Sequence, residues 1–216
     1  MSYFSSTIGR KQMVGLAGIG LSGFVLTHMA GNLLMFVGPE AYNKYAHALI
    51  SNPLIYVAEA VLMGMFVAHL VIALILVVKN KKAKGSTYAV SGTKNKASFA
   101  SRTMQFQGIV ILAFLVWHLI TFKYGTYYPA NYDGVEMRDL FRLMEESFAQ
   151  PLYVGAYLIV LLILGTHLGH GLASSFQSLG LNGEKYDSKI KCIGKAYAAL
   201  VTVGFLLPPF YIYLIH

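Results

Sequence analysis

The amino-acid sequence predicts an all-α membrane protein, a bundle of five transmembrane helices. Of its 216 residues, 56% are hydrophobic and only 12% are charged, whereas charged residues make up about a quarter of a typical soluble domain. Its mean hydropathy is +0.57. Five runs carry almost no charge, and each is long enough for the roughly 20 apolar residues that cross a bilayer as a helix. These observations argue against a soluble domain.

The five expected spans follow one another in a single domain over residues 1–216. They cover approximately residues 13–37, 54–79, 103–123, 151–175 and 191–214. The first span is too long for a cleavable signal peptide, and no small-x-small cleavage site with a polar sequel follows it. We therefore expect the first span to remain in the mature protein.

The first span contains Gly18, Gly20 and Gly23 at the G-x-G-x-x-G spacing of a dinucleotide-binding turn. Such a turn needs a strand before it and a helix N-terminus after it. Here the glycines lie within a spanning helix, where the backbone amides are already committed to the helical hydrogen bonds. We interpret Gly15, Gly18 and Ser22 instead as a small-residue surface that a second helix or a flat ligand can approach closely.

The basic residues predict that the N-terminus is cytoplasmic, because loops rich in Lys and Arg stay on that side of the membrane. The expected inner segments contain Arg10, Lys11, Lys79, Lys81, Lys82, Lys84, Lys94, Lys96, Arg102, Lys185, Lys189, Lys191 and Lys195. The opposite side has only Lys44, Lys123, Arg138 and Arg142. The net charge of +8 is thus interpreted as a topology and headgroup signal, not as a nucleic-acid-binding surface.

The segment between spans three and four, residues 125–150, is long for a connection in a helical bundle. Its apolar residues recur at helical spacing: Met137, Leu140, Phe141, Met144 and Phe148. This pattern predicts a short amphipathic helix on the outer surface. The helix would either cover the mouth of a site or serve only for packing.

Four of the seven histidines lie deep in different spans: His28, His69, His118 and His167. A polar group at such depth is costly and is usually functional, although a single one can simply form a hydrogen bond between helices. From the rise per residue, His28 and His118 lie about 22 Å from the inner edge of their spans. Spans two and four run the opposite way, which puts His69 and His167 about 24 Å from the outer edge. The histidines therefore form an outer pair, His28 and His118, and an inner pair, His69 and His167.

Two imidazoles that face each other from different helices are the axial ligands of a six-coordinate haem iron. Zinc would instead take four ligands in one cluster. Four histidines in two layers therefore predict a bundle around two stacked haems, each with two histidine ligands to its iron. Because both axial positions are filled, the expected chemistry is electron transfer. Cys192 is the only cysteine and no C-x-x-C-H motif occurs, so the haems would be held without covalent attachment.

Two further features concern the inner haem. Gly18 and Gly108 each lie ten residues before a histidine of the outer pair, at the depth of the inner pair. We interpret these glycines as making room for the inner macrocycle, with helix packing as the alternative. His170 lies three residues after His167 on roughly the same face and is the alternative ligand in the fourth span.

The histidines lie in the stretches GRKQMVGLAGIGLSGFVLTHMAGNLLMFVGPEAYNKYA, PLIYVAEAVLMGMFVAH, GIVILAFLVWH and PLYVGAYLIVLLILGTHLGHGLASSFQSLGLN. These stretches resemble the five-helix, dihaem cytochrome b membrane-anchor subunit of succinate dehydrogenases and fumarate reductases. The resemblance implies that His28 and His118 ligate the iron of a distal haem b, and that His69 and His167 ligate that of a proximal one.

The resemblance also implies partners, a substrate and a location. The partners are a flavoprotein subunit and an iron-sulfur subunit on the cytoplasmic side, with a dimer of heterotrimers as a further possibility. Electrons would pass between the iron-sulfur subunit and a membrane quinone, commonly menaquinone, whose site lies near the distal haem. The location is the bacterial cytoplasmic (inner) membrane, and the role is in a respiratory chain.

Glu59, about five residues into the second span, is the only carboxylate within a span and could exchange protons with a quinone. The alternative is a helix-end acid that reaches the headgroups. Gly165 stands where some relatives carry a carboxylate, so the chain departs from the family pattern there. Two other functions also stay open from the residues alone: a dihaem cytochrome b of another membrane dehydrogenase, and a histidine-lined proton transporter.

Overall fold

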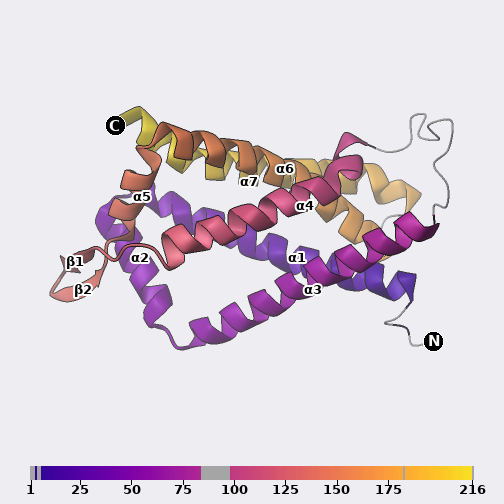
Figure 1. The fold of residues 1–216 in the computed structure, drawn as a ribbon, viewed down its shortest axis with the longest axis horizontal. Helices are drawn as coiled ribbons and strands as arrows, with labels where there is room; N and C mark the ends of the chain where they lie inside the picture. The colour runs from indigo at the N-terminus through magenta and orange to yellow at the C-terminus, as the bar shows by residue number, and fades with distance from the viewer. Residues whose placement is uncertain (1–2, 4–5, 84–97, 182, 216) are drawn as a thin grey trace.

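The computed structural model of the chain describes residues 3, 6–83, 98–181 and 183–215. Within these residues, five helices are long and apolar enough to cross a membrane (Figure 1). They are α1 (Thr7–Asn32) with its 3-10 extension η2 (Leu33–Phe36), α3 (Leu54–Ala83), α4 (Phe99–His118) with the π-helical turn η3 (Leu119–Lys123), α6 (Pro151–Ser178) and α7 (Glu184–Ile215). The all-helical fold with five candidate spans is thus confirmed.

Several helices extend beyond the expected spans because polar residues continue the helix past the apolar run. Helix α1 begins after its N-cap residue, Ser6, whose Oγ accepts a hydrogen bond from the Gly9 amide at 3.0 Å. Ser98 caps α4 in the same way, which is a favoured role for serine. At the C-terminal end of α6, Gly180 adopts φ +77°, the left-handed conformation in which many helices end.

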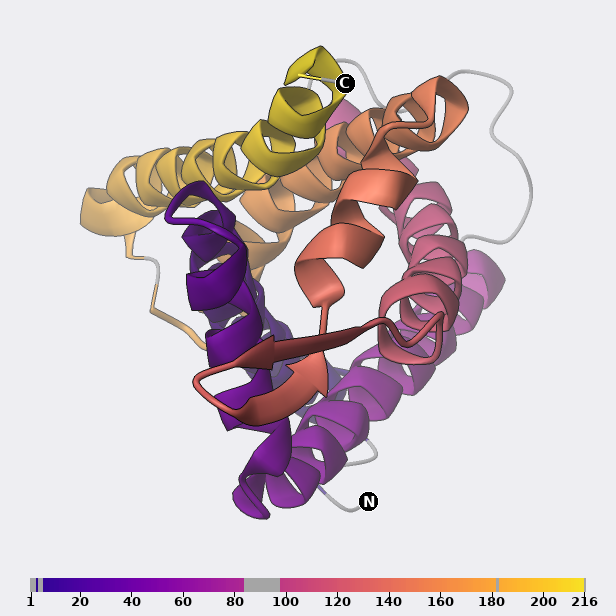
Figure 2. The ribbon, with the colours of Figure 1, turned by 90° about the vertical axis from the view of Figure 1, so that its left-hand side faces the viewer.

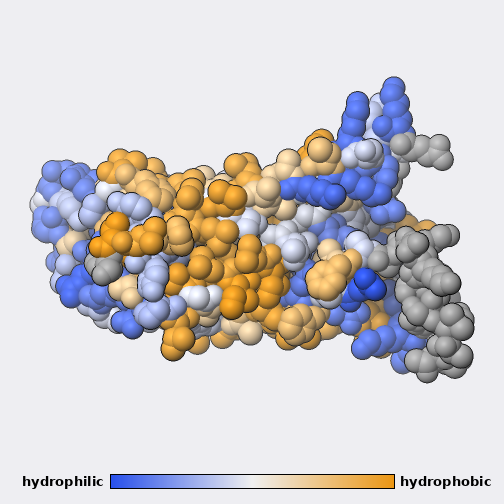
Figure 3. Space-filling view, turned by 90° about the horizontal axis from the view of Figure 1, so that it is seen from above, coloured by the Kyte–Doolittle hydropathy of each residue, from blue (hydrophilic) through white to orange (hydrophobic). Residues whose placement is uncertain are grey.

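The two ends of the bundle differ in chemistry. One end, here called the basic end, contains the start of α1, the end of α3 and the start of α4; the other, the hairpin end, contains the β-strands (Figure 1). Apolar residues form a middle band and hydrophilic residues lie at both ends (Figure 3). Lys81 and Lys82 close α3 at the basic end. Of the other basic residues expected on that side, Lys84, Lys94 and Lys96 lie outside the described residues.

Helix α6 occupies the centre of the packing, in contact with α1, α4 and α7, while α3 packs mainly on α1. Small residues permit this close approach, as expected for helices in lipid. A Cβ built on Gly165 of α6 would lie 2.2 Å from Oγ1 of Thr202 in α7. A Cβ on Gly15 of α1 would lie 3.4 Å from the backbone of Ser175 in α6. Glycine therefore sets the spacing of these helix pairs.

A cap of short elements crosses the hairpin end of the bundle (Figure 2). It consists of α2 (Pro39–Ser51), a hairpin of β1 (Pro129–Tyr132) and β2 (Val135–Arg138), and α5 (Leu140–Phe148). The short amphipathic helix expected after the third span is confirmed as α5, which buries Leu143, Met144 and Phe148. The sequence analysis did not predict α2 or the hairpin.

Met137 was wrongly expected on the helical face of α5. It lies in β2 instead, where it is buried and pairs with Ala130. The cause is the turn between the strands, in which Asp133 and Gly134 have φ of 52° and 80°. An Asp-Gly pair with two positive φ values is the favoured two-residue hairpin turn, and it extends the chain through Met137 before α5 begins.

Buried polar groups hold the cap together and join it to the bundle. Asn43 of α2 is fully buried; its amide donates to Asp139 Oδ1 at 2.8 Å and its carbonyl accepts from the Phe141 amide at 3.0 Å. Arg138 donates to the carbonyl oxygens at the end of η3 and just after it, those of Phe122, Lys123, Gly125 and Thr126. These carbonyls have no helical donor, so the guanidinium fixes the chain that follows His118.

Candidate functional site

The outer pair meets between two helices. His28 of α1 and His118, the last residue of α4, have ring centroids 5.8 Å apart with an interplanar angle of 88°. The two imidazoles come from residues 90 positions apart in the sequence and were expected to lie at one depth. The structure brings this predicted pair together, while their role as metal ligands stays a prediction.

The inner pair meets in the same manner. The ring centroids of His69 in α3 and His167 in α6 are 6.4 Å apart, with an interplanar angle of 67°. Nδ1 of His69 lies 3.3 Å from the carbonyl oxygen of Val14, and a Cβ on Gly18 would lie 3.5 Å from Cε1 of the same ring. The inner pair therefore lies level with residues 14–18 of α1.

The two pairs are separated along the helix axis. His28 is ten residues beyond Gly18 on α1, which corresponds to about 15 Å at the rise of an α-helix. The expected arrangement of two pairs at different depths is thus present in the structure. The inner pair lies toward the basic end and the outer pair toward the hairpin end.

The paired histidines bridge helices that do not pack closely on each other. Within the described part of the chain, neither α1 with α4 nor α3 with α6 is among the helix pairs in close contact. The imidazoles nevertheless approach one another in both cases. Side chains, rather than backbone contact, therefore define the space between these helices.

The separation of the rings fits two axial ligands of one metal. Two metal–nitrogen bonds of about 2.0 Å, together with about 1.2 Å from each nitrogen to its ring centre, would set the centroids about 6.4 Å apart. The observed values of 5.8 and 6.4 Å are close to this. No group of three or more His, Cys, Asp or Glu among the described residues could hold a metal ion. Two histidines at each level are the protein ligands that a haem iron takes, and a haem at either pair stays a prediction.

The second ring nitrogen of each histidine has a different environment. Nδ1 of His118 lies 3.1 Å from Oη of Tyr157, and Nδ1 of His69 faces the Val14 carbonyl. In both rings this leaves Nε2 for a metal, the usual arrangement for a ligating histidine. Nδ1 of His167 is buried and has no hydrogen-bond partner among the described residues.

His28 differs from the other three. Its Nε2 lies 3.5 Å from Nδ2 of Asn32, a distance at which a hydrogen bond is weak. The same Asn32 amide donates to the carbonyl oxygen of His28 at 2.9 Å, and Tyr42 donates to Asn32 Oδ1 at 3.0 Å. Asn32 is thus held by the backbone and by the cap rather than by the imidazole, so Nε2 stays available.

Aromatic rings surround the outer pair. Phe24 stacks on His28 with centroids 5.4 Å apart, and Phe205 lies 5.8 Å from the same ring. Phe114 and Phe122 lie 5.7 and 5.3 Å from His118. These four phenyl rings form an apolar enclosure around the two imidazoles. Neither this enclosure nor the contact with Tyr157 was predicted from the sequence. The available signal for Tyr157 was its hydroxyl within an apolar span.

Two other predicted features remain open. His170 lies one turn beyond His167 on α6 and is partly exposed, whereas the ring that His69 faces is that of His167. A Cβ on Gly108 would meet no atom within 4 Å. The choice of His167 over His170, and the roles of Gly18 and Gly108 beside a macrocycle, stay predictions.

Glu59 forms an ion pair that the sequence analysis did not foresee. Its carboxylate accepts a hydrogen bond from Lys123, the last residue of η3, and the two side chains are 45% and 40% exposed. The pair joins the start of α3 to the end of η3 at the hairpin end. Glu59 is therefore a partly exposed, paired carboxylate rather than an isolated one in the bilayer.

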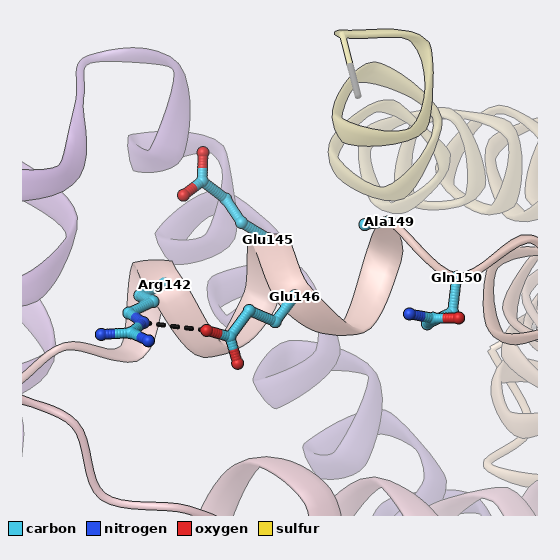
Figure 4. Close-up of a pocket in the computed structure, with 5 residues that line it drawn as sticks. All are labelled: Arg142, Glu145, Glu146, Ala149 and Gln150. Carbon is cyan, nitrogen blue, oxygen red and sulfur yellow. Dashed lines mark hydrogen bonds and ion pairs between the residues drawn. The ribbon is translucent and has the colours of Figure 1, made fainter.

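The hairpin end also has a pocket of its own, on α5 and the residues just after it (Figure 4). It is lined by Arg142, Glu145, Glu146, Ala149 and Gln150, and contains none of the predicted site residues. Hydrogen bonds from the Tyr128 hydroxyl and from Arg142 lower the pKa of Glu146. The carboxylate is therefore ionised at neutral pH and pairs with Arg142. We interpret this pocket as part of the surface of the cap.

Comparisons with models of protein families, with characterised proteins and with solved structures found no match for this chain. The functional conclusion is therefore drawn from the two histidine pairs and their surroundings, together with the sequence.

Proposed function

We propose that this chain is the membrane-anchor and electron-transfer subunit of a succinate:quinone oxidoreductase or quinol:fumarate reductase. Two b-type haems, when bound, would supply one-electron transfer between an iron-sulfur subunit and a membrane quinone. His28 and His118 would hold the outer haem, and His69 and His167 the inner one. The observation that carries this proposal is the meeting of four imidazoles as two pairs at two depths.

The residues favour electron transfer over chemistry at the metal. Each pair would supply two histidine ligands to its iron, and a haem held in this way would transfer electrons rather than bind a substrate at the metal. Phenyl rings pack against His28 and His118 and make the surroundings of the outer pair apolar. The pairs are offset by about 15 Å along the helices, so the two haems would lie at different depths in the bilayer.

The basic end is the surface where we propose that the flavoprotein and iron-sulfur subunits bind, with the N-terminus on the cytoplasmic side of a bacterial inner membrane. This location is supported by the concentration of basic residues at that end, for example Lys81 and Lys82 in the last turn of α3. The quinone, for which we propose menaquinone, would react near the outer pair. This chain would then be the non-flavin subunit of an enzyme complex, at which the quinone is reduced or the quinol oxidised.

A reduced-minus-oxidised absorption spectrum of the purified complex tests the proposal. We expect two low-spin b-type haems per copy of this chain, reduced by succinate or by a quinol, and co-purification with a flavoprotein and an iron-sulfur protein. A colourless polypeptide would contradict the proposal and favour a histidine-lined transporter. Two haems with a formate or hydrogen dehydrogenase as partner would retain the cytochrome but change the enzyme.

Glu59 is the residue that we propose exchanges protons with the quinone. Replacing Glu59 with Gln removes the ionisable group but keeps its size, so we expect quinone turnover to fall about a hundredfold or more, the usual scale for general acid–base catalysis. The haem content should not change, because a half-exposed ion pair contributes no more than about 1 kcal/mol to stability.

Glu40→Gln is the matched control, since Glu40 pairs with Lys44 on α2 and is 58% exposed. Steady-state assays with a defined quinone compare the two variants. Equal turnover in wild type and Glu59→Gln would show that Glu59 only joins α3 to η3 through Lys123.

A further inference from the structure

Tyr157 is a buried hydroxyl in direct contact with the outer pair. It lies on α6 and is 4% exposed, and its Oη is 3.1 Å from Nδ1 of His118. Its ring packs against those of Phe114, Trp117, Phe148 and Tyr153, with centroids 4.8, 5.1, 5.0 and 4.9 Å away, and the Tyr153 hydroxyl lies 3.4 Å from its Oη. Packing against these four rings holds the hydroxyl next to the imidazole.

We propose that Tyr157 is the positioning residue of the outer metal site. Its Oη accepts the Nδ1–H of His118, which selects the tautomer that presents Nε2 to the metal and fixes the rotation of the ring. The inference rests on the proposed function, because it assigns a role toward a haem ligand. It adds a residue from a third helix to a site otherwise built from α1 and α4.

His69, His167 and His118 differ in whether a substitution can remove the hydrogen-bond partner of Nδ1. The Nδ1 partner of His69 is a backbone carbonyl, that of Val14, which no substitution removes. Nδ1 of His167 has no partner in the described part of the chain. For His118 the partner is a side chain, so its effect can be isolated by removing one oxygen atom.

The direction of the effect follows from the hydrogen bond. An acceptor at Nδ1 makes the imidazole a stronger donor through Nε2, and stronger donation stabilises ferric over ferrous iron. Loss of the acceptor therefore raises the reduction potential of the outer haem. Second-shell partners commonly change metal-site properties by a factor of 10 or more, and tenfold corresponds to 59 mV for a one-electron couple.

The experiment is a spectroscopic redox titration of the haem-loaded complex, comparing wild type with Tyr157→Phe. We expect both haems to remain bound, the potential of one haem to rise by about 59 mV, and the other to stay unchanged. Titration of His69→Ala, which retains only the outer haem, shows which of the two has moved when Tyr157→Phe is added to it.

Tyr197→Phe is the control. It also removes a hydroxyl from the bundle, but that hydroxyl donates to the backbone carbonyl of Ser22 at 2.6 Å and not to an imidazole. We expect Tyr197→Phe to leave both potentials unchanged. An equal shift in both variants would overturn the inference, since it would reflect general loosening of the bundle.

Two unchanged potentials in Tyr157→Phe, with two haems present, would overturn the positioning role while leaving the proposed function intact. A wild-type complex without haem would overturn both. If Tyr157→Phe fails to assemble, 3-fluorotyrosine at position 157 keeps the shape and weakens the oxygen as an acceptor. The potential of the outer haem should then rise in the same direction by a smaller amount, and no rise would overturn the inference.

Discussion

Replacement of His118 by alanine is expected to halve the haem content of the complex, from two haems per chain to one. The remaining haem should keep its spectrum, because the inner pair is about 15 Å away along the helices and shares no ligand with the outer pair. His28→Ala should remove the same haem, since the ring of His28 is the one that faces His118. Haem is quantified as the pyridine haemochrome per copy of the chain.

Double variants test the pairing itself. His28→Ala with His118→Ala removes two ligands of one haem, so one haem per chain should remain. His28→Ala with His69→Ala removes one ligand from each haem, and none should remain. Loss of both haems in the His28→Ala, His118→Ala variant, or retention of one haem in the His28→Ala, His69→Ala variant, would contradict the pairing.

His170→Ala is the control within the fourth span. His170 is one turn from His167 on α6, but the ring of His167 faces His69, with centroids 6.4 Å apart. We expect His170→Ala to retain two haems and His167→Ala to retain one. The reverse result would show that the inner haem is held by His170.

Gly165→Leu is expected to lower the stability of the bundle by about 1–3 kcal/mol, the usual cost of overpacking a close interface. A Cβ at this position lies 2.2 Å from Thr202 Oγ1 and 3.3 Å from its Cβ. Threonine is stiff about its first side-chain torsion, so it cannot move away freely and α7 must separate from α6. Thermal unfolding in detergent, followed by circular dichroism, measures the loss.

Gly171→Leu provides a matched control on the same helix. A Cβ on Gly171 meets no atom of the described residues within 4 Å, while the gain in helix propensity over glycine is the same at both positions. We expect Gly171→Leu to be neutral or slightly stabilising. Equal destabilisation by the two variants would show that the closeness of α6 and α7 does not depend on Gly165.

Short-range signals account for the elements of the cap that the sequence analysis overlooked. Pro39 at the first position of α2 and Glu40 in its first turn are typical of a helix start, and Asp133-Gly134 is typical of a hairpin turn. The helical spacing of the apolar residues predicted that Met137 lies in a helix. The prediction was wrong at this residue, because the hairpin turn places Met137 in a strand. Local turn chemistry determined the outcome, because positive φ at both turn residues commits the flanking chain to strands.

Other contacts have no such signal because their partners are far apart in the sequence. Asn43 meets Asp139 across 96 positions, and Glu59 meets Lys123 across 64. The first contact holds two parts of the cap together and the second joins the start of α3 to the end of η3. Both depend on how the connections fold back over the end of the bundle. Neither pairing follows from helix periodicity or from hydropathy.

The sequence by itself determined which segments can cross the membrane and how deep each histidine lies, because both follow from the apolar thickness of a bilayer and the fixed rise of an α-helix. Depth also predicted the two histidine pairs, but it left open how the rings are oriented and what holds them. Only the tertiary structure decided that the ring centroids lie 5.8 and 6.4 Å apart and that Tyr157 lies against Nδ1 of His118. The rotation of a helix about its axis, which selects these contacts, is set by side-chain packing against its neighbours.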